Sequence, residues 1–161
     1  MFVYSIRAST IKFFGFIAVT LAILIGVVVM GSGGAVAAMG SGEVDYSGIK
    51  TNEDRIEFIE RFGLRVDAEP IEEIPFAMPD NFDRVIMGYN ELQKKQGLDL
   101  SEYSKKKVTR YTYKVTNYDC EGEVYANLFV YRSKIVACDV CSANPEGFVV
   151  PLTLVDVSKL K

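Results

Sequence analysis

Histidine and tryptophan are absent from this 161-residue chain, and cysteine occurs only three times. The absence of histidine excludes Ser-His-Asp and Cys-His catalytic triads, and it removes the commonest ligand of catalytic zinc. P-loop, dinucleotide-binding and nucleophile-elbow motifs are missing as well. The sequence therefore predicts a protein that is not a conventional enzyme and holds neither a metal ion nor a cofactor.

Charge is missing from one long segment, the eighteen residues from Phe13 to Met30. At about 1.5 Å of rise per residue, a helix of this length spans roughly 27 Å, close to the thickness of a bilayer core. Arg7 and Lys12 precede the segment, and the next basic residue is Lys50. The positive-inside rule then predicts a transmembrane signal-anchor at 13–30, with residues 1–12 in the cytoplasm and the rest of the chain outside.

A cleaved signal peptide is the alternative, because Ala35-Val36-Ala37 fits the small-x-small cleavage pattern. The protein would then be secreted after cleavage near Ala37. In either case residues 31–48 are rich in Gly, Ala and Ser and are expected to form a flexible linker. Residues 49–161 are then sufficient for one extracytoplasmic domain.

Acidic residues outnumber basic ones in the part of the chain that is expected outside the membrane. All 21 acidic residues but only sixteen of the 18 basic ones follow Gly42, which gives that part a net charge of −5. This balance suits a soluble surface and argues against nucleic acid as a partner.

Capping residues and hydrophobic periodicity predict an α+β domain. One helix is expected after Thr51, ending at Gly63, and a second from near Asp80, ending at Gly97. Alternating hydrophobic residues favour strands, with an antiparallel meander in the second half of the chain. The expected strands cover 64–69, 71–78 (an edge strand), 107–115, 123–131, 134–142 and 148–154. We expect both helices to pack on one face of a mainly antiparallel sheet that ends in a three- to four-stranded meander.

Several short motifs, in this order, resemble domain-of-unknown-function family 4830, small proteins of Gram-positive bacteria that often carry an N-terminal membrane segment. The motifs lie at 55–59, 62–63, 82–83, 89–93, 96–100, 111–118 and 139–142. The resemblance implies a domain from about Thr51 to Phe148 and an extracytoplasmic setting. The family carries no assigned activity, so no catalytic residue is implied.

The cysteines suggest a structural disulfide. A two-residue turn at Arg132-Ser133 would place Cys141 opposite Val124, near Cys120, so a Cys120–Cys141 bond is predicted with Cys138 as a buried thiol. Three unpaired cysteines are the alternative. Cys138 and Cys141 form a C-x-x-C motif, but positions i and i+3 of a strand face opposite ways, which argues against thiol-redox catalysis.

Two further groups are candidate binding residues. An aromatic face for a peptide or glycan would comprise Tyr111, Tyr113, Tyr125 and Tyr131, although such tyrosines also serve as ordinary cross-strand pairs. A basic cluster for anionic wall polymers or lipid headgroups would comprise Lys105, Lys106, Lys107 and Arg110, although such runs are often simply solvated.

These observations lead to three hypotheses for function. The first is a membrane-anchored, non-enzymatic interaction or sensing module of the cell envelope, with the lipid bilayer and another envelope protein or wall component as partners. The second is an envelope hydrolase or thiol-redox enzyme that uses Cys or carboxylate residues such as Glu72 and Glu73. The third is a folded spacer. An enzyme should bring such residues together in a cleft, whereas a binding module should expose a recognition surface.

Overall fold

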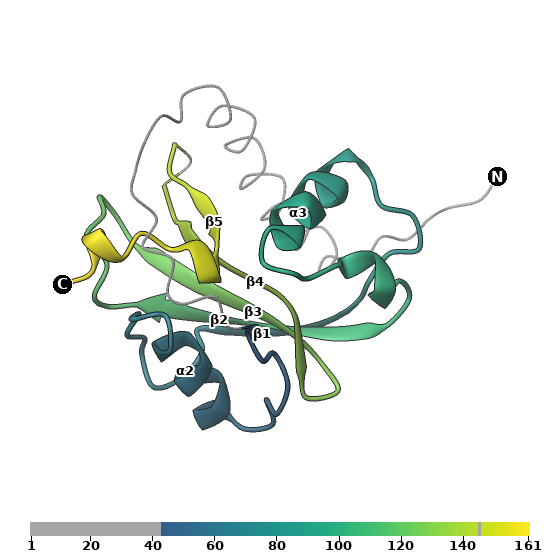
Figure 1. Ribbon diagram of the computed structural model, residues 1–161, viewed down its shortest axis with the longest axis horizontal. Helices are drawn as coiled ribbons and strands as arrows, with labels where there is room; N and C mark the ends of the chain where they lie inside the picture. The colour runs from purple at the N-terminus through teal and green to yellow at the C-terminus, as the bar shows by residue number, and fades with distance from the viewer. Residues whose placement is uncertain (1–42, 145) are drawn as a thin grey trace.

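A five-stranded antiparallel sheet forms the centre of the domain, in the order β1-β2-β3-β4-β5 (Figure 1). The computed structural model describes residues 43–144 and 146–161. The strands are β1 (Glu72–Ala77), β2 (Lys107–Val115), β3 (Val124–Tyr131), β4 (Lys134–Ser142) and β5 (Val149–Pro151). The helices are α2 (Asn52–Glu60) and α3 (Arg84–Lys94), and short 3-10 turns cover Leu100–Tyr103, Leu152–Leu154 and Val157–Lys159. The α+β class, the two helices and the antiparallel meander are therefore confirmed.

Local capping determines where the two helices begin. Thr51 caps α2 through a capping box with Asp54, as its sequence predicts. The second helix begins later than predicted, because Asp83 rather than Asp80 accepts a hydrogen bond from the backbone N–H of Ile86. Both carboxylates have the chemistry of an N-cap, and only the fold determines which of them is used.

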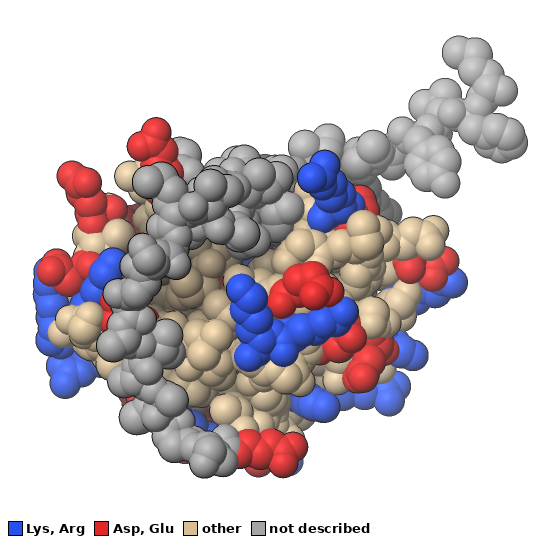
Figure 2. Space-filling model, turned by 45° about the horizontal axis from the view of Figure 1, so that its top comes forward, with Lys and Arg blue, Asp and Glu red and all other residues tan. Residues whose placement is uncertain are grey.

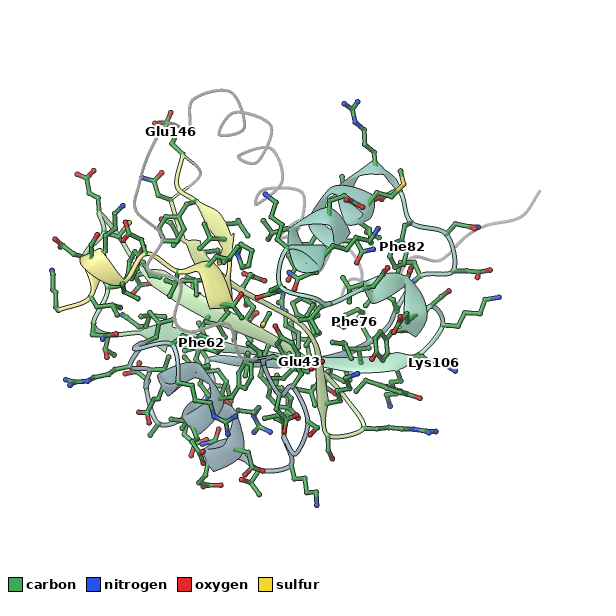
Figure 3. All side chains as sticks on the ribbon, viewed as in Figure 1. Glu43, Phe62, Phe76, Phe82, Lys106 and Glu146 are labelled. Carbon is green, nitrogen blue, oxygen red and sulfur yellow. The ribbon has the colours of Figure 1, made fainter. Side chains whose placement is uncertain are left out.

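The two helices lie on opposite faces of the sheet, so the prediction that they share one face is wrong (Figure 1). On one face, Phe58 and Ile59 of α2 pack against a core that includes Tyr113 and Leu128. On the other face, α3 packs on a second core that includes Phe129. Figure 3 places Phe76 and Phe82 on this α3 side. The central strands are consequently buried on both faces, which explains why β4 is nearly continuously apolar.

The β3–β4 hairpin is tight at its turn and irregular farther along. Arg132 and Ser133 both have positive φ angles, 45° and 64°, as expected for a two-residue turn of the I′ type. The pairing begins in the predicted register with Val130 opposite Ile135, but it shifts at a β-bulge after Phe129. Beyond the bulge, Cys141 lies opposite Tyr125, so its predicted position opposite Val124 is wrong by one residue.

The folded domain begins before Ile49. Val44 and Tyr46 pack against the α2-side core, and the Tyr46 hydroxyl donates to the carbonyl of Gln96 at 2.6 Å. Their composition predicts that they belong to the flexible linker, but their tertiary contacts make them part of the domain. The segment expected as a strand at 64–69 forms only an isolated bridge at Val66.

The predicted anchor at 13–30, the N-terminus at 1–12 and most of the linker lie outside the described residues. Among the helices of residues 43–144 and 146–161, none has the length and hydrophobicity needed to cross a bilayer.

Candidate functional site

The four candidate tyrosines do not form one aromatic face. Tyr111 and Tyr113 lie two residues apart on β2, so both side chains face α2, and Tyr113 is fully buried there. Tyr125 and Tyr131 lie on β3 in phase with Phe129, which belongs to the α3-side core. Strand alternation therefore separates the set into two pairs on opposite faces of the sheet, and a single aromatic platform is excluded.

The predicted basic cluster is likewise divided. Lys105 forms an ion pair with Asp80 at 2.9 Å, and Arg110 is buried on the α3 side with an ion pair to Glu72 at 2.8 Å. Lys106 is exposed at the end of the sheet (Figure 3). Of the four residues, Lys107 alone reaches the groove described below.

All three cysteines are free thiols in the structure, and the predicted Cys120–Cys141 bond is absent from it. The register shift turns Cys141 into the buried α3 side of β4, next to Asn127, whose side-chain amide donates to its Sγ at 3.4 Å. Cys120 is half-exposed in the loop before β3. Burial raises the pKa of the Cys138 and Cys141 thiols, so neither favours the reactive thiolate.

A basic groove lies between the start of α2 and the β3–β4 hairpin. Its volume is about 270 Å³, and four cationic side chains line it, Lys50, Arg55, Lys107 and Arg132. The hydroxyl-bearing residues Thr109, Tyr111 and Ser133 complete the lining with Ile49 and Val130. We call this feature the basic groove.

Sequence reasoning identified one of these cations, Lys107, and missed the other three. Lys50, Arg55 and Arg132 come from segments far apart in the chain, and backbone contacts bring the segments together. The N–H of Ile49 donates to the carbonyl of Ser133, and that of Ile135 donates to the carbonyl of Tyr46. These bonds hold the first described segment between α2 and the hairpin (Figure 1). The one local signal in the sequence for this groove is the Arg132-Ser133 turn pair, because neither residue is typical of a turn that requires positive φ angles.

Arg55 is held in a fixed orientation by two tyrosines. Its guanidinium lies over the Tyr111 ring at 3.8 Å from the ring centroid, and its Nε donates to the Tyr113 hydroxyl at 2.7 Å. Tyr113 in turn donates to Asn52 at 2.8 Å. The two Nη groups of Arg55 form no hydrogen bond within residues 43–144 and 146–161, so they are available to a ligand.

A second polar cluster lies buried between α3 and the sheet. The carboxylate of Asp139 accepts hydrogen bonds from the Tyr89 hydroxyl and, at 2.9 Å, from Asn127, which also accepts from Thr112. Burial raises the pKa of Asp139 to about 6, although its hydrogen bonds and nearby Arg110 oppose the shift. The residues are nearly inaccessible, so this cluster lacks the access that a substrate would need.

The closed pocket beside this cluster is equally unsuited to a ligand. It is lined by apolar atoms of residues that include Phe76, Tyr89 and Phe129, and its volume is about 10 Å³. A single water molecule needs roughly 10–15 Å³ of such space. Within the described part of the chain, no group of three or more His, Cys, Asp or Glu side chains could hold a metal ion.

Charge over the visible surface is mixed. Figure 2 shows acidic and basic side chains interspersed over one face of the molecule, without a broad region of either sign. The charge on this face therefore does not by itself single out a binding surface.

Comparison with known proteins identifies one family. Searches for similar curated proteins and for similar solved structures each returned no match. The family described as "Domain of unknown function (DUF4830)" matches residues 58–140, a range that runs from near the end of α2 almost to the end of β4 and includes the central strands of the sheet. That match covers more than half of the chain, and the protein is a member of the DUF4830 family.

Proposed function

We propose that this protein is a non-enzymatic interaction or sensing module of the cell envelope, anchored through residues 13–30 with its domain outside the membrane. The observation that carries the proposal is the basic groove. Its four cations form no ion pair within residues 43–144 and 146–161, whereas six of the other twelve basic residues that follow Gly42 do. Cations left unpaired along one concavity are suited to bind an acidic partner.

The arrangement of reactive groups supports binding over catalysis. The two buried thiols have raised pKa values and lie away from the groove. Glu72 and Glu73, considered as a carboxylate pair, face opposite sides of the edge strand, because Glu72 pairs with Arg110 whereas Glu73 contacts Tyr111. A hydrolase or thiol-redox enzyme would need such groups to converge in an accessible cleft.

The proposal is tested by pull-down of the tagged full-length chain from membranes solubilised in a mild detergent. The groove variant K50Q/K107Q removes two exposed charges, and K95Q/K106Q removes two exposed charges outside the groove. We expect a partner that is recovered reproducibly with the wild-type chain and with K95Q/K106Q, but reduced with K50Q/K107Q. Equal recovery with all three chains, or no reproducible partner, would contradict the proposal. A folded spacer would give this second result.

A further inference from the structure

The basic groove presents hydrogen-bond donors from three directions. Arg55 projects from α2, Lys107 and Thr109 from β2, and Arg132 and Ser133 from the hairpin turn. Arg55 is already oriented toward the groove by Tyr111 and Tyr113, whereas the Arg132 guanidinium lies 5.3 Å from the centroid of Tyr131, a ring on the α3 side of the sheet. Side chains that are oriented before binding lose less conformational entropy when a ligand binds.

Two carboxylates near this groove attract its cations, Asp54 acting on Lys50 and Glu53 on Arg55, but no ion pair with them forms in the described part of the chain. The Asp54 side chain accepts hydrogen bonds from the backbone N–H groups of Lys50 and Thr51, and so serves the helix cap. Glu73 lies beside Tyr111 and contributes to the raised pKa of that tyrosine, which is mainly due to burial. Glu73 likewise forms no ion pair with the four groove cations in the described part of the chain.

The mixture of donors favours a phosphate group over a carboxylate. A carboxylate is planar and is satisfied by one guanidinium in a bidentate pair. A phosphate has several acceptor oxygens that point in different directions, and Arg, Lys and hydroxyl side chains are its usual protein ligands. The groove combines two arginines and two lysines with the hydroxyls of Thr109 and Ser133.

The position of the groove also suits a membrane phosphate. The twelve residues 31–42 separate the predicted anchor from the first described residue, Glu43, and can extend at most roughly 43 Å. The chain then runs beside the hairpin as far as Lys50, at the groove itself. A domain on so short a tether stays within reach of lipid headgroups.

We infer that the basic groove binds a phosphate group, carried either by an anionic lipid headgroup or by a soluble phosphate ester. The inference rests on the proposed function and specifies the ligand of the same groove. Each lysine contact is expected to contribute about fivefold to the affinity, as is typical of basic residues at an anionic surface.

The test measures binding to the full-length chain purified in a maltoside detergent, whose headgroup has neither charge nor phosphate. Microscale thermophoresis reports the affinities for glycerol 3-phosphate and for a soluble short-chain phosphatidylglycerol, with the zwitterionic phosphatidylcholine analogue as control. We expect K50Q/K107Q to bind the anionic compounds about 25-fold more weakly than the wild-type chain. K95Q/K106Q, with the same change of net charge, should stay within about twofold.

The outcomes separate the two phosphate sources. Similar affinity for glycerol 3-phosphate and the lipid supports recognition of the phosphate group alone, whereas clear preference for phosphatidylglycerol supports a lipid headgroup. Failure of both compounds to bind, or equal loss in the two double variants, overturns the inference. If neither compound binds but the pull-down still distinguishes the variants, the groove serves a protein partner and the proposed function stands without the phosphate. Binding of glycerol 3-phosphate by a chain shown to lie in the cytoplasm would retain the inference and overturn the proposed location.

Discussion

At the scale of single residues, the ionisation of Asp139 makes the stability of the α3-side core depend on pH. Its side chain is buried with Tyr89, Asn127 and Cys141 around it and with Arg110 nearby. Because burial raises its pKa from the ordinary value of 3.8 to about 6, the native state favours the protonated form. The stability that this group contributes is fully present below the unfolded pKa of 3.8 and is lost as the pH rises through the folded pKa of about 6.

We therefore predict that Asp139→Asn removes a pH dependence of unfolding. The free energy of unfolding of the wild-type chain should fall by about 3 kcal/mol, relative to the variant, between pH 3 and pH 7, which follows from roughly 1.4 kcal/mol for each unit of raised pKa. Urea denaturation at several pH values measures the difference. A constant difference between the two chains over this range would show that Asp139 does not titrate as described.

Tyr113 is the residue on which the orientation of Arg55 depends. Its hydroxyl accepts from Arg55 Nε and donates to Asn52 Oδ1, so Tyr113→Phe leaves both groups without this partner. We expect a loss of about 1–2 kcal/mol in the free energy of unfolding. Tyr111→Phe is the matched control, because it keeps the ring beneath Arg55 and should cost less. Urea denaturation of the two variants measures both losses. Equal losses in the free energy of unfolding would refute the role of the Tyr113 hydroxyl.

At the scale of elements, the β3–β4 hairpin carries backbone strain in its turn. Ser133 has a φ of 64°, a conformation that glycine adopts without a steric penalty and that other residues adopt at a cost. We predict that Ser133→Gly raises the free energy of unfolding by about 0.5–1 kcal/mol. Ser133→Ala keeps the Cβ and should give no such gain. Thermal unfolding of both variants measures the effect, and a gain with alanine would assign it to the hydroxyl instead of the backbone.

The same hairpin connects backbone strain with the proposed binding site. Arg132 and Ser133 both line the basic groove, so the turn that conflicts with local preference is the one that places a cation and a hydroxyl at the proposed site. Because Ser133→Gly and Ser133→Ala both remove the hydroxyl, weaker phosphate binding by the glycine variant than by the alanine variant would connect backbone strain with binding at this position.

At the scale of the whole molecule, the three thiols report both folding and location. In the native chain a maleimide should label Cys120, which is half-exposed, and should reach Cys138 and Cys141 only after denaturation. A membrane-impermeant maleimide should label the same single cysteine on intact cells if the domain lies outside. Labelling of Cys120 only after cell lysis would place the domain in the cytoplasm and contradict the predicted topology.

The same experiment addresses the predicted disulfide. With free thiols, denaturation without reductant exposes three reactive cysteines, as the structure indicates. One reactive cysteine would instead show that two of the three become bonded in the exported protein, as the predicted Cys120–Cys141 bond requires. Cys120→Ser provides the control, since it should leave two reactive thiols after denaturation.

Local signals in the sequence were sufficient for much of the fold. Thr51 caps α2 because its side chain and that of Asp54 satisfy backbone donors three residues apart, a purely local interaction. Alternation and turn residues likewise predicted β4 within its observed bounds, and the proline-containing segment at 71–78 as an edge strand. The family was also evident from short motifs, and the match at 58–140 confirms it.

Interactions between residues only a few positions apart are thus sufficient to specify the class of the domain, most of its elements and the hairpin turn. The placement of α2 and α3 on opposite faces depends on tertiary packing, because the apolar stripe of a helix can pack equally well on either face of a sheet. Tertiary structure also decided the register beyond the bulge, which separated Cys141 from its predicted position. The basic groove belongs to this second class, since Lys50 and Arg132 become neighbours only when the first segment of the domain pairs with the end of the hairpin.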